Sequence, residues 1–386
     1  MCKTVLKRKE RKRKKYVSSV TDRNPVATEG SSATRWGRVL EMSGDDVGVS
    51  MGSRSGTGAG NSVQSKFAKL AERAKMGLFD PNLVEGEKFV QGAERALRQS
   101  TIFATFPKIE DSMYYYSKAA ECFRRSKLWE EAGDCYHRVA DNQKNSGNKH
   151  AAAMAFVDCA LMYERMHEME AVNYYTSAVS VFAEIGRFTQ AAKYQERIAG
   201  IFVAHDEELR GITAFQQAAD YYIADGEHTL ADRCLERVAE LSGKHERYDR
   251  AAETFEALGM RALQFNLRRF NAKTFFLRAQ LCLFAKKDHK QAQRVRRRMK
   301  DLDYMFGSMA ECMFCEHIGA NMRDCKFHEF MDHVYNFNNV CPLTVWELEM
   351  LERIKDIIMA KEFQRLAKER AEKEAWIEAN KKKKKR

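Results

Sequence analysis

The strongest constraint on the fold is a pattern that recurs about every twenty residues between residues 110 and 285. In each unit an aromatic, His or Met residue is followed within two to four positions by alanine. These alanines are Ala132, Ala152, Ala171, Ala191, Ala231 and Ala251, which gives steps of 20, 19, 20, 40 and 20 residues. The segment GITAFQQAADYY fills the double step, so the pattern predicts consecutive helices that pair into hairpins of about 40 residues, longer than a standard tetratricopeptide repeat.

One unit, AAKYQERIAGIF, shows how such helices would pack. Small residues alternate with large apolar ones at helical spacing: Ala191, Ala192 and Ala199 with Tyr194, Ile198 and Phe202. Such a helix cannot bury its apolar face alone and must stack on its neighbours. None of the four prolines, at positions 25, 81, 107 and 342, interrupts residues 110–285. We therefore predict an all-α, tetratricopeptide-like solenoid of helical hairpins, a twisted sheet of helices, followed by a C-terminal helical bundle.

The formal charge of +12 belongs to the two ends of the chain. Residues 1–15 contain nine Lys or Arg and one Glu, and residues 381–386 are all Lys or Arg, so the remaining residues have a net charge of −2. Four regions are expected. These are a disordered basic and Ser/Gly-rich extension at 1–62, a helical-repeat array at 63–285, a helical bundle at 286–358, and a charged tail, helical or disordered, at 359–386. The basic arm could contact nucleic acid or anionic lipid, could be a nuclear localisation signal, or could be a solvated tail.

Ten cysteines without an apolar signal region indicate a reducing compartment, and no stretch is long enough to span a membrane. We expect a cytoplasmic, peripherally membrane-associated protein. No nucleophile, pair of carboxylates or glycine-rich phosphate loop stands out from the repeats, so the sequence predicts neither an enzyme nor a bound cofactor.

Two local segments have two interpretations each. In STIFATFPK, the side chains of Phe103 and Phe106 either tuck under the first hairpin or form an exposed apolar loop. Further on, Cys312, Cys315, Cys325 and His328 have the spacing of a zinc knuckle. The helical spacing of the surrounding apolar residues favours helix packing there, with no metal.

The ordered set of segments resembles one family. FVDCALMYERMHEMEAVNYYTSAVSVFAEIGRFTQAAKYQERIAGIF is similar to the core of the alpha-SNAP (soluble NSF attachment protein) family, through Gly186, Arg187, Phe188, Thr189, Ala191, Ala192 and Lys193. LTVWELEMLERIKDII resembles the last helix of that family, and the resemblance runs from about residue 85 to residue 358.

The resemblance implies an adaptor with no catalytic residues. It implies that the protein coats SNARE complexes and recruits NSF, the hexameric AAA ATPase that pulls them apart in vesicle trafficking and membrane fusion. The family's SNARE-facing groove is basic, and the matching positions here are Arg165, Lys193, Arg233, Arg237, Lys273 and Arg278. The family's membrane-attaching loop falls at STIFATFPK, which favours Phe103 and Phe106 as membrane contacts.

The resemblance breaks down at the C-terminus. The family ends in a short acidic tail with a Leu near its end, whereas this chain continues past Ile358 and ends in KKKKKR. An alternative is therefore a helical-repeat scaffold for another protein partner that has lost coupling to NSF. A nucleic-acid-binding repeat protein is a third possibility, although the body lacks a basic stripe with interleaved exposed aromatics.

Overall fold

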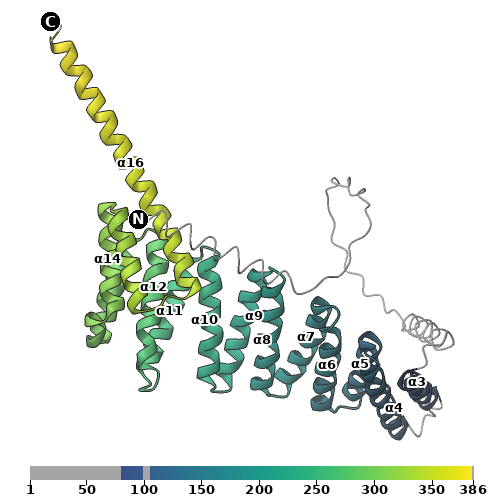
Figure 1. Cartoon of the computed structure of the whole chain (residues 1–386). Helices are drawn as coiled ribbons and strands as arrows, with labels where there is room; N and C mark the ends of the chain where they lie inside the picture. The colour runs from purple at the N-terminus through teal and green to yellow at the C-terminus, as the bar shows by residue number, and fades with distance from the viewer. Residues whose placement is uncertain (1–79, 99–104, 385–386) are drawn as a thin grey trace, which may run out of the picture. The chain divides into compact units, whose positions relative to one another are not determined.

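The computed structural model describes residues 80–98 and 105–384, with the backbone alone for residues 105–108 and 378–384. Within these residues it contains fourteen α-helices and two short 3-10 helices, and no strand (Figure 1). The helices of the array are α3 (Pro81–Arg98), α4 (Thr105–Arg125), α5 (Trp129–Asn145), α6 (Lys149–Tyr163), α7 (Glu168–Glu184), α8 (Phe188–Ala204), α9 (Glu208–Ala224), α10 (His228–Lys244), α11 (Tyr248–Leu263) and α12 (Ala272–Ala285). The predicted fold class is confirmed.

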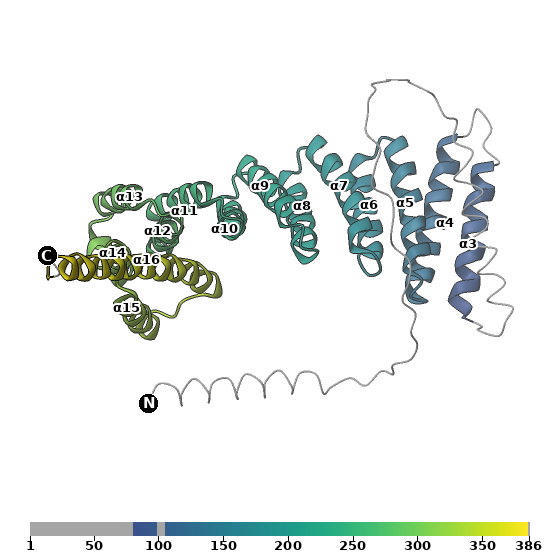
Figure 2. The same ribbon diagram turned by 90° about the horizontal axis from the view of Figure 1, so that it is seen from above.

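Helices α3 to α12 stack in the order of the sequence (Figures 1 and 2). Each helix packs against the next, because links of three or four residues make most neighbours antiparallel. The small residues of the pattern allow this close packing: Ala191, Ala192 and Ala199 of α8 are fully buried. Between them, the ring of Tyr194 stacks on the rings of Tyr175 and Phe182, with centroids 5.8 Å from each.

Seven of the turns that follow helices α4 to α12 share one hydrogen-bond pattern. In the turn after α7, the backbone N–H of Arg187 donates to the carbonyl oxygen of Phe182 at 2.9 Å, which is the six-to-one bond of a Schellman motif. Gly186, with φ of 72°, supplies the left-handed residue that the motif needs. The same bond closes the turns after α4, α5, α8, α9, α10 and α12. Most links of the array therefore use the same type of turn.

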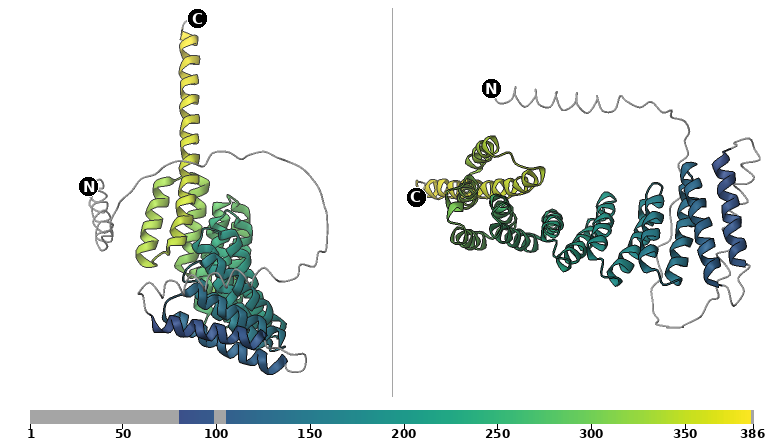
Figure 3. Two further views of the ribbon diagram at one scale, coloured as in Figure 1. Left: turned by 90° about the vertical axis from the view of Figure 1, so that its right-hand side faces the viewer. Right: turned by 90° about the horizontal axis from the view of Figure 1, so that it is seen from below.

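A bundle of helices follows the array. It consists of α13 (His289–Leu302), α14 (Ala310–Asp324), α15 (Phe327–Val340) and α16 (Val345–Lys384), with the 3-10 helices η1 (Arg269–Asn271) and η2 (Tyr304–Ser308) in the loops before α12 and α14. Helix α16 packs along α10, α12, α14 and α15 (Figures 1 and 3). Its buried side chains end at Ile358, and all its described side chains from Phe363 onward are exposed.

The buried apolar residues form two clusters. One runs from Val90 in α3 to Leu241 in α10, and the other from Ala239 in α10 to Ile358 in α16. The second cluster therefore includes α11 and α12 together with the bundle. The domain boundary expected at residue 285 stays a prediction, and residues 1–62 lie outside the described part of the chain.

Candidate functional site

Two of the predicted basic residues occupy equivalent places in successive even-numbered helices. Lys193 is the sixth residue of α8 and Arg233 the sixth residue of α10, and both side chains are exposed. Arg197 and Arg237 follow four residues later in the same helices and are also exposed. The 40-residue repeat therefore places two pairs of cations on one side of two neighbouring helices.

Ion pairs join this side of the array from helix to helix. Arg197 of α8 binds Glu164, which directly follows α6, with 2.9 Å between Nε and Oε2. Arg233 of α10 binds Glu196 of α8 at 2.9 Å. From the odd-numbered helices, the hydroxyl of Tyr175 donates a 2.6 Å hydrogen bond to Glu164. The ion pairs Arg197–Glu164 and Arg233–Glu196 form a ladder across three hairpins.

Arg165 lies at the α6 end of this ladder, beside Glu164. Its guanidinium is 4.7 Å from the centroid of the Trp129 ring, and its side chain is exposed. At the other end, Arg237 binds Glu240 at 2.6 Å and lies where α10 meets the start of α16. We call Arg165, Lys193, Arg197, Arg233 and Arg237 the basic surface.

Sequence reasoning missed Arg197. Arg197 is the tenth residue of α8, as Arg237 is of α10, so the repeat itself was the signal that could have found it.

The two remaining predicted cations are held inside the protein. Lys273 is half-buried and binds the buried Glu311 at 2.8 Å. Arg278 is 6% exposed and binds Glu347 at 2.9 Å and Glu236 at 2.6 Å. Burial alone would lower the pKa of Arg278, but these carboxylates raise it above its usual value. The structure thus places Arg278 in the interior and not on the predicted binding surface, because Glu347 of α16 folds over it.

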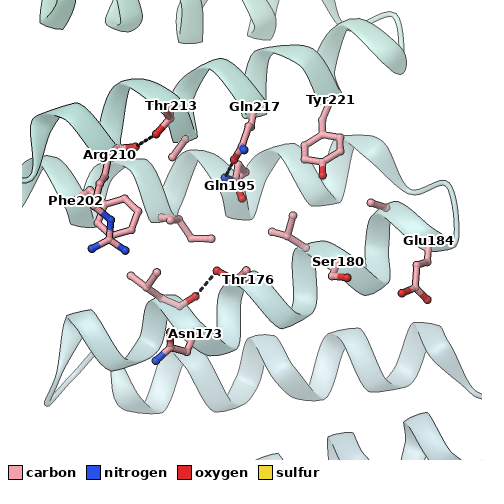
Figure 4. Close-up of a pocket in the computed structure, with 15 residues that line it drawn as sticks. Asn173, Thr176, Ser180, Glu184, Gln195, Phe202, Arg210, Thr213, Gln217 and Tyr221 are labelled. Atoms are coloured by element: carbon pink, nitrogen blue, oxygen red, sulfur yellow. Dashed lines mark hydrogen bonds between the residues drawn. The ribbon is translucent and has the colours of Figure 1, made fainter. Parts of the chain in front are cut away.

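A groove lies on the other side of α8. It has a volume of about 660 Å³ and is lined by side chains of α7, α8 and α9, among them Gln195, Phe202 and Gln217 (Figure 4). The amide of Gln195 donates a 2.6 Å hydrogen bond to Gln217 Oε1, and Arg210 stacks 4.1 Å from the centroid of Phe202. Lys193 precedes Gln195 by two residues, or roughly 200° around the helix, so it faces away from the groove.

The four residues with zinc-knuckle spacing do not assemble. Cys312 and Cys315 are buried in α14, and burial raises the pKa of both thiols. Cys325 ends α14 in a left-handed conformation, with φ of 55°, and His328 is exposed in α15. Among the described residues, no group of three or more His, Cys, Asp or Glu side chains could hold a metal ion.

The predicted membrane loop lies mostly outside the described part of the chain. Phe103 falls in the gap between α3 and α4, and Phe106 is in the first turn of α4, where only the backbone is described. No helix within residues 80–98 and 105–384 combines the length and apolarity needed to cross a bilayer.

Comparison with known proteins shows which family this chain resembles. The family model described as soluble NSF attachment protein, SNAP, matches residues 84–359. The chain belongs to the soluble NSF attachment protein family. The predicted resemblance is confirmed over nearly the range expected, and membership makes the chain a non-enzymatic adaptor.

Relatives from a plant, an animal and a fungus match similar lengths of this SNAP-family chain. The alpha-soluble NSF attachment protein of Vitis vinifera is 30% identical over 283 residues, 73% of this chain and 97% of the relative. That of Homo sapiens is 28% identical over 281 residues, 72% of this chain and 94% of the relative. The probable vesicular-fusion protein sec17 homolog of Schizosaccharomyces pombe is 24% identical over 284 residues, 72% and 98% respectively. The family match leaves out residues 1–83 and 360–386, which include both basic ends.

Proposed function

We propose that this protein is an adaptor that binds SNARE complexes and recruits an NSF-type AAA ATPase for their disassembly in vesicle trafficking and membrane fusion. Its family membership and the names of its relatives, NSF attachment proteins and a probable vesicular-fusion protein, support this role. The observation that carries the proposal is the basic surface, which repeats Lys193 at Arg233 and Arg197 at Arg237 on the successive even-numbered helices α8 and α10.

The basic surface suits an acidic helical bundle as its ligand. Exposed cations steer an acidic partner and tolerate variation in its sequence, because the attraction does not depend on one buried contact. The ion pairs to Glu164 and Glu196 hold Arg197 and Arg233 in place while leaving both side chains more than half exposed. In the proposed complex, a SNARE bundle lies across α6, α8 and α10, and Lys193 and Arg233 contact its carboxylates.

Membrane attachment is proposed at Phe103, which falls between α3 and α4, and at Phe106 in the first turn of α4. Phe103 and Phe106 would contact lipid and keep the adaptor, otherwise cytoplasmic, at the membrane that carries the SNAREs. Burial of two phenylalanine side chains contributes roughly 3 to 6 kcal/mol, which is enough for weak and reversible attachment.

The C-terminus supports a second candidate, a SNAP-fold scaffold for another protein partner without NSF coupling. Helix α16 continues to Lys384, well past its last buried residue, Ile358, and the residues beyond Ala360 are rich in Lys and Arg. Coupling to NSF therefore needs its own test.

The deciding experiment is disassembly of a soluble SNARE complex by NSF and ATP, with this protein as the only adaptor. We would compare the full-length chain, a chain truncated after Ile358, and the double variant Lys193→Glu/Arg233→Glu. The matched control is Lys290→Glu/Arg294→Glu, which reverses two exposed cations of α13. We expect disassembly with the full-length chain, a loss of roughly tenfold or more in the first double variant, and full activity in the control.

Each outcome selects one function. SNARE binding without disassembly in both the full-length and truncated chains would favour the scaffold. Disassembly by the truncated chain alone would show that the basic tail restrains NSF. Equal activity of the two double variants would remove the basic surface from the proposal.

A further inference from the structure

Two loops at one end of the bundle expose an unusual set of large apolar side chains. The first loop joins α11 to α12 and the second joins α13 to α14. Leu267 is 99% exposed, Tyr304 91% and Phe270 71%. With their neighbours they form what we call the apolar tip: Phe265, Leu267, Phe270, Leu302, Tyr304 and Met305. Exposed apolar patches of this kind mark interaction sites.

The two loops lie side by side. Arg269 of the first loop binds Asp303 of the second, with 3.0 Å between Nη2 and Oδ1, and Asp303 is buried. Beneath them the buried ring of Phe306 meets the ring of Phe276 edge to face, with centroids 5.3 Å apart. The apolar tip therefore rests on a packed base.

Cations next to the apolar tip are paired with carboxylates of the protein. Arg268 binds the buried Asp232, which also binds Arg261 at 2.9 Å. Lys273 binds the buried Glu311, and its ammonium lies 4.1 Å from the centroid of Phe270. The cations closest to the first loop are thus neutralised within the protein.

Part of the backbone of both loops is paired within the protein. The N–H groups of Arg268 and Arg269 both donate to the carbonyl oxygen of Phe265 at 2.9 Å. In the second loop, the N–H of Phe306 donates to the carbonyl oxygen of Asp303 at 2.9 Å, and Met305 N–H donates to the Asp303 carboxylate at 3.3 Å. A segment that enters lipid has to pair its backbone groups within the protein, and these bonds meet part of that requirement.

We propose that the apolar tip inserts into the interfacial layer of a lipid bilayer. The apolar side chains are exposed on two loops that the Arg269–Asp303 ion pair joins, while the neighbouring cations Arg268 and Lys273 are paired with buried carboxylates. Tyr304 suits the boundary between lipid chains and headgroups, and Leu267 and Phe270 are of the apolar types that bury next to that boundary. Because the nearby cations are paired, this contact needs no anionic lipid. The contact goes beyond the proposed function and does not depend on it.

The test is binding of the full-length protein to neutral phosphatidylcholine vesicles in about 0.5 M salt, where the basic ends of the chain are screened. The tip variant is Leu267→Glu/Tyr304→Glu. The control variant is Tyr335→Glu/Val340→Glu, which changes two residues of α15 that are 69% and 74% exposed. We expect the partition coefficient of the tip variant to fall about tenfold or more, and that of the control to stay within about twofold of the wild type.

A second measurement locates the side chain. Tyr304→Trp should show quenching by brominated lipid above the wild-type background, whereas Tyr335→Trp should not. Equal vesicle binding by the tip variant and the wild type, or no added quenching in the Tyr304→Trp variant, overturns the proposal. Loss of lipid binding in the control as well also overturns it, since the effect would then be one of net charge. SNARE disassembly in lipid-free solution is expected to be unchanged in the tip variant, so this test and that of the proposed function fail independently.

Discussion

The indole Nε1 of Trp346 donates a 2.9 Å hydrogen bond to the backbone carbonyl oxygen of Glu240, 106 residues earlier in the chain. The same indole closes over Gly243, and its ring meets that of Phe255 edge to face at 5.3 Å. Arg353, two turns along α16, donates to the carbonyl oxygen of Gly243 at 2.9 Å. The last helix is thus fastened to the C-terminal end of α10, across the junction between the two apolar clusters.

Removal of this anchor should destabilise the protein. Trp346→Ala is expected to lower the free energy of unfolding by about 3 kcal/mol, because it leaves a cavity against Phe255 and removes the hydrogen bond from the indole to Glu240. Urea unfolding followed by circular dichroism measures the change. Trp376→Ala serves as the control, since Trp376 is 68% exposed. Equal losses in the free energy of unfolding for the two substitutions would show that the contacts of the Trp346 indole do not stabilise the protein.

Two glycines should respond to alanine in opposite ways. A Cβ at Gly259 in α11 would overlap Cε1 of Phe276, a ring that is fully buried. Gly259→Ala is expected to cost about 1–3 kcal/mol of stability through overpacking. Gly200→Ala in α8 should instead add about 0.5–1 kcal/mol, because that position is exposed and nothing lies within 4 Å of the new methyl group. Thermal melting of both variants gives the sign, and a stabilised Gly259→Ala would contradict the packing described for α11 and α12.

The cysteines should separate into two reactivity classes. Of the nine cysteines in the described residues, seven are buried, and Cys325 and Cys341 are partly exposed. Burial raises the pKa of Cys234 to about 12, so its thiol carries almost no reactive thiolate at neutral pH. With Cys2 replaced by Ser, we expect Ellman's reagent to modify two thiols quickly in the native protein and the other seven only on unfolding. Rapid modification of more than two would show that the array opens locally.

An ion pair at the end of the α9–α10 hairpin should make stability depend on pH. A hydrogen bond from Lys244 is the main cause that lowers the pKa of the Glu208 carboxyl, and His245 acts in the same direction at 2.7 Å. Since the folded-state pKa is below the unfolded value, the stabilisation is present above about pH 4.3 and is lost as the pH falls through the folded-state pKa.

The test of this ion pair is Lys244→Met. The substitution should cost less than about 1 kcal/mol at neutral pH, because the lysine lies at the surface, and the cost should disappear in acid. Urea unfolding at pH 7 and at pH 3 measures both values. A cost that is the same at the two pH values would assign the effect to packing of the lysine stem. Lys287→Met, at an exposed lysine for which no ion pair is found in the described residues, is the control.

The sequence was sufficient to predict the array because the repeat pattern depends only on residues that are close together in the chain. Ala191, Ala192 and Phe202 have the spacing that places them on one side of α8. Gly186 falls where the preceding helix, α7, must end. The spacing of 40 residues also places Lys193 and Arg233 on equivalent positions. These inferences need only the helical period and the length of one hairpin.

Contacts between distant segments were decided by the tertiary structure alone. Arg278 has the same sequence character as the exposed cations, yet Glu347, 69 residues later, covers it. Arg269 and Asp303 join two loops into the apolar tip. The sequence of neither loop indicates that it pairs with the other. The repeat determines which side of each helix is buried, because that depends on its own residues. Which carboxylate meets which cation depends on how the bundle closes over the end of the array, and that is a property of the whole fold.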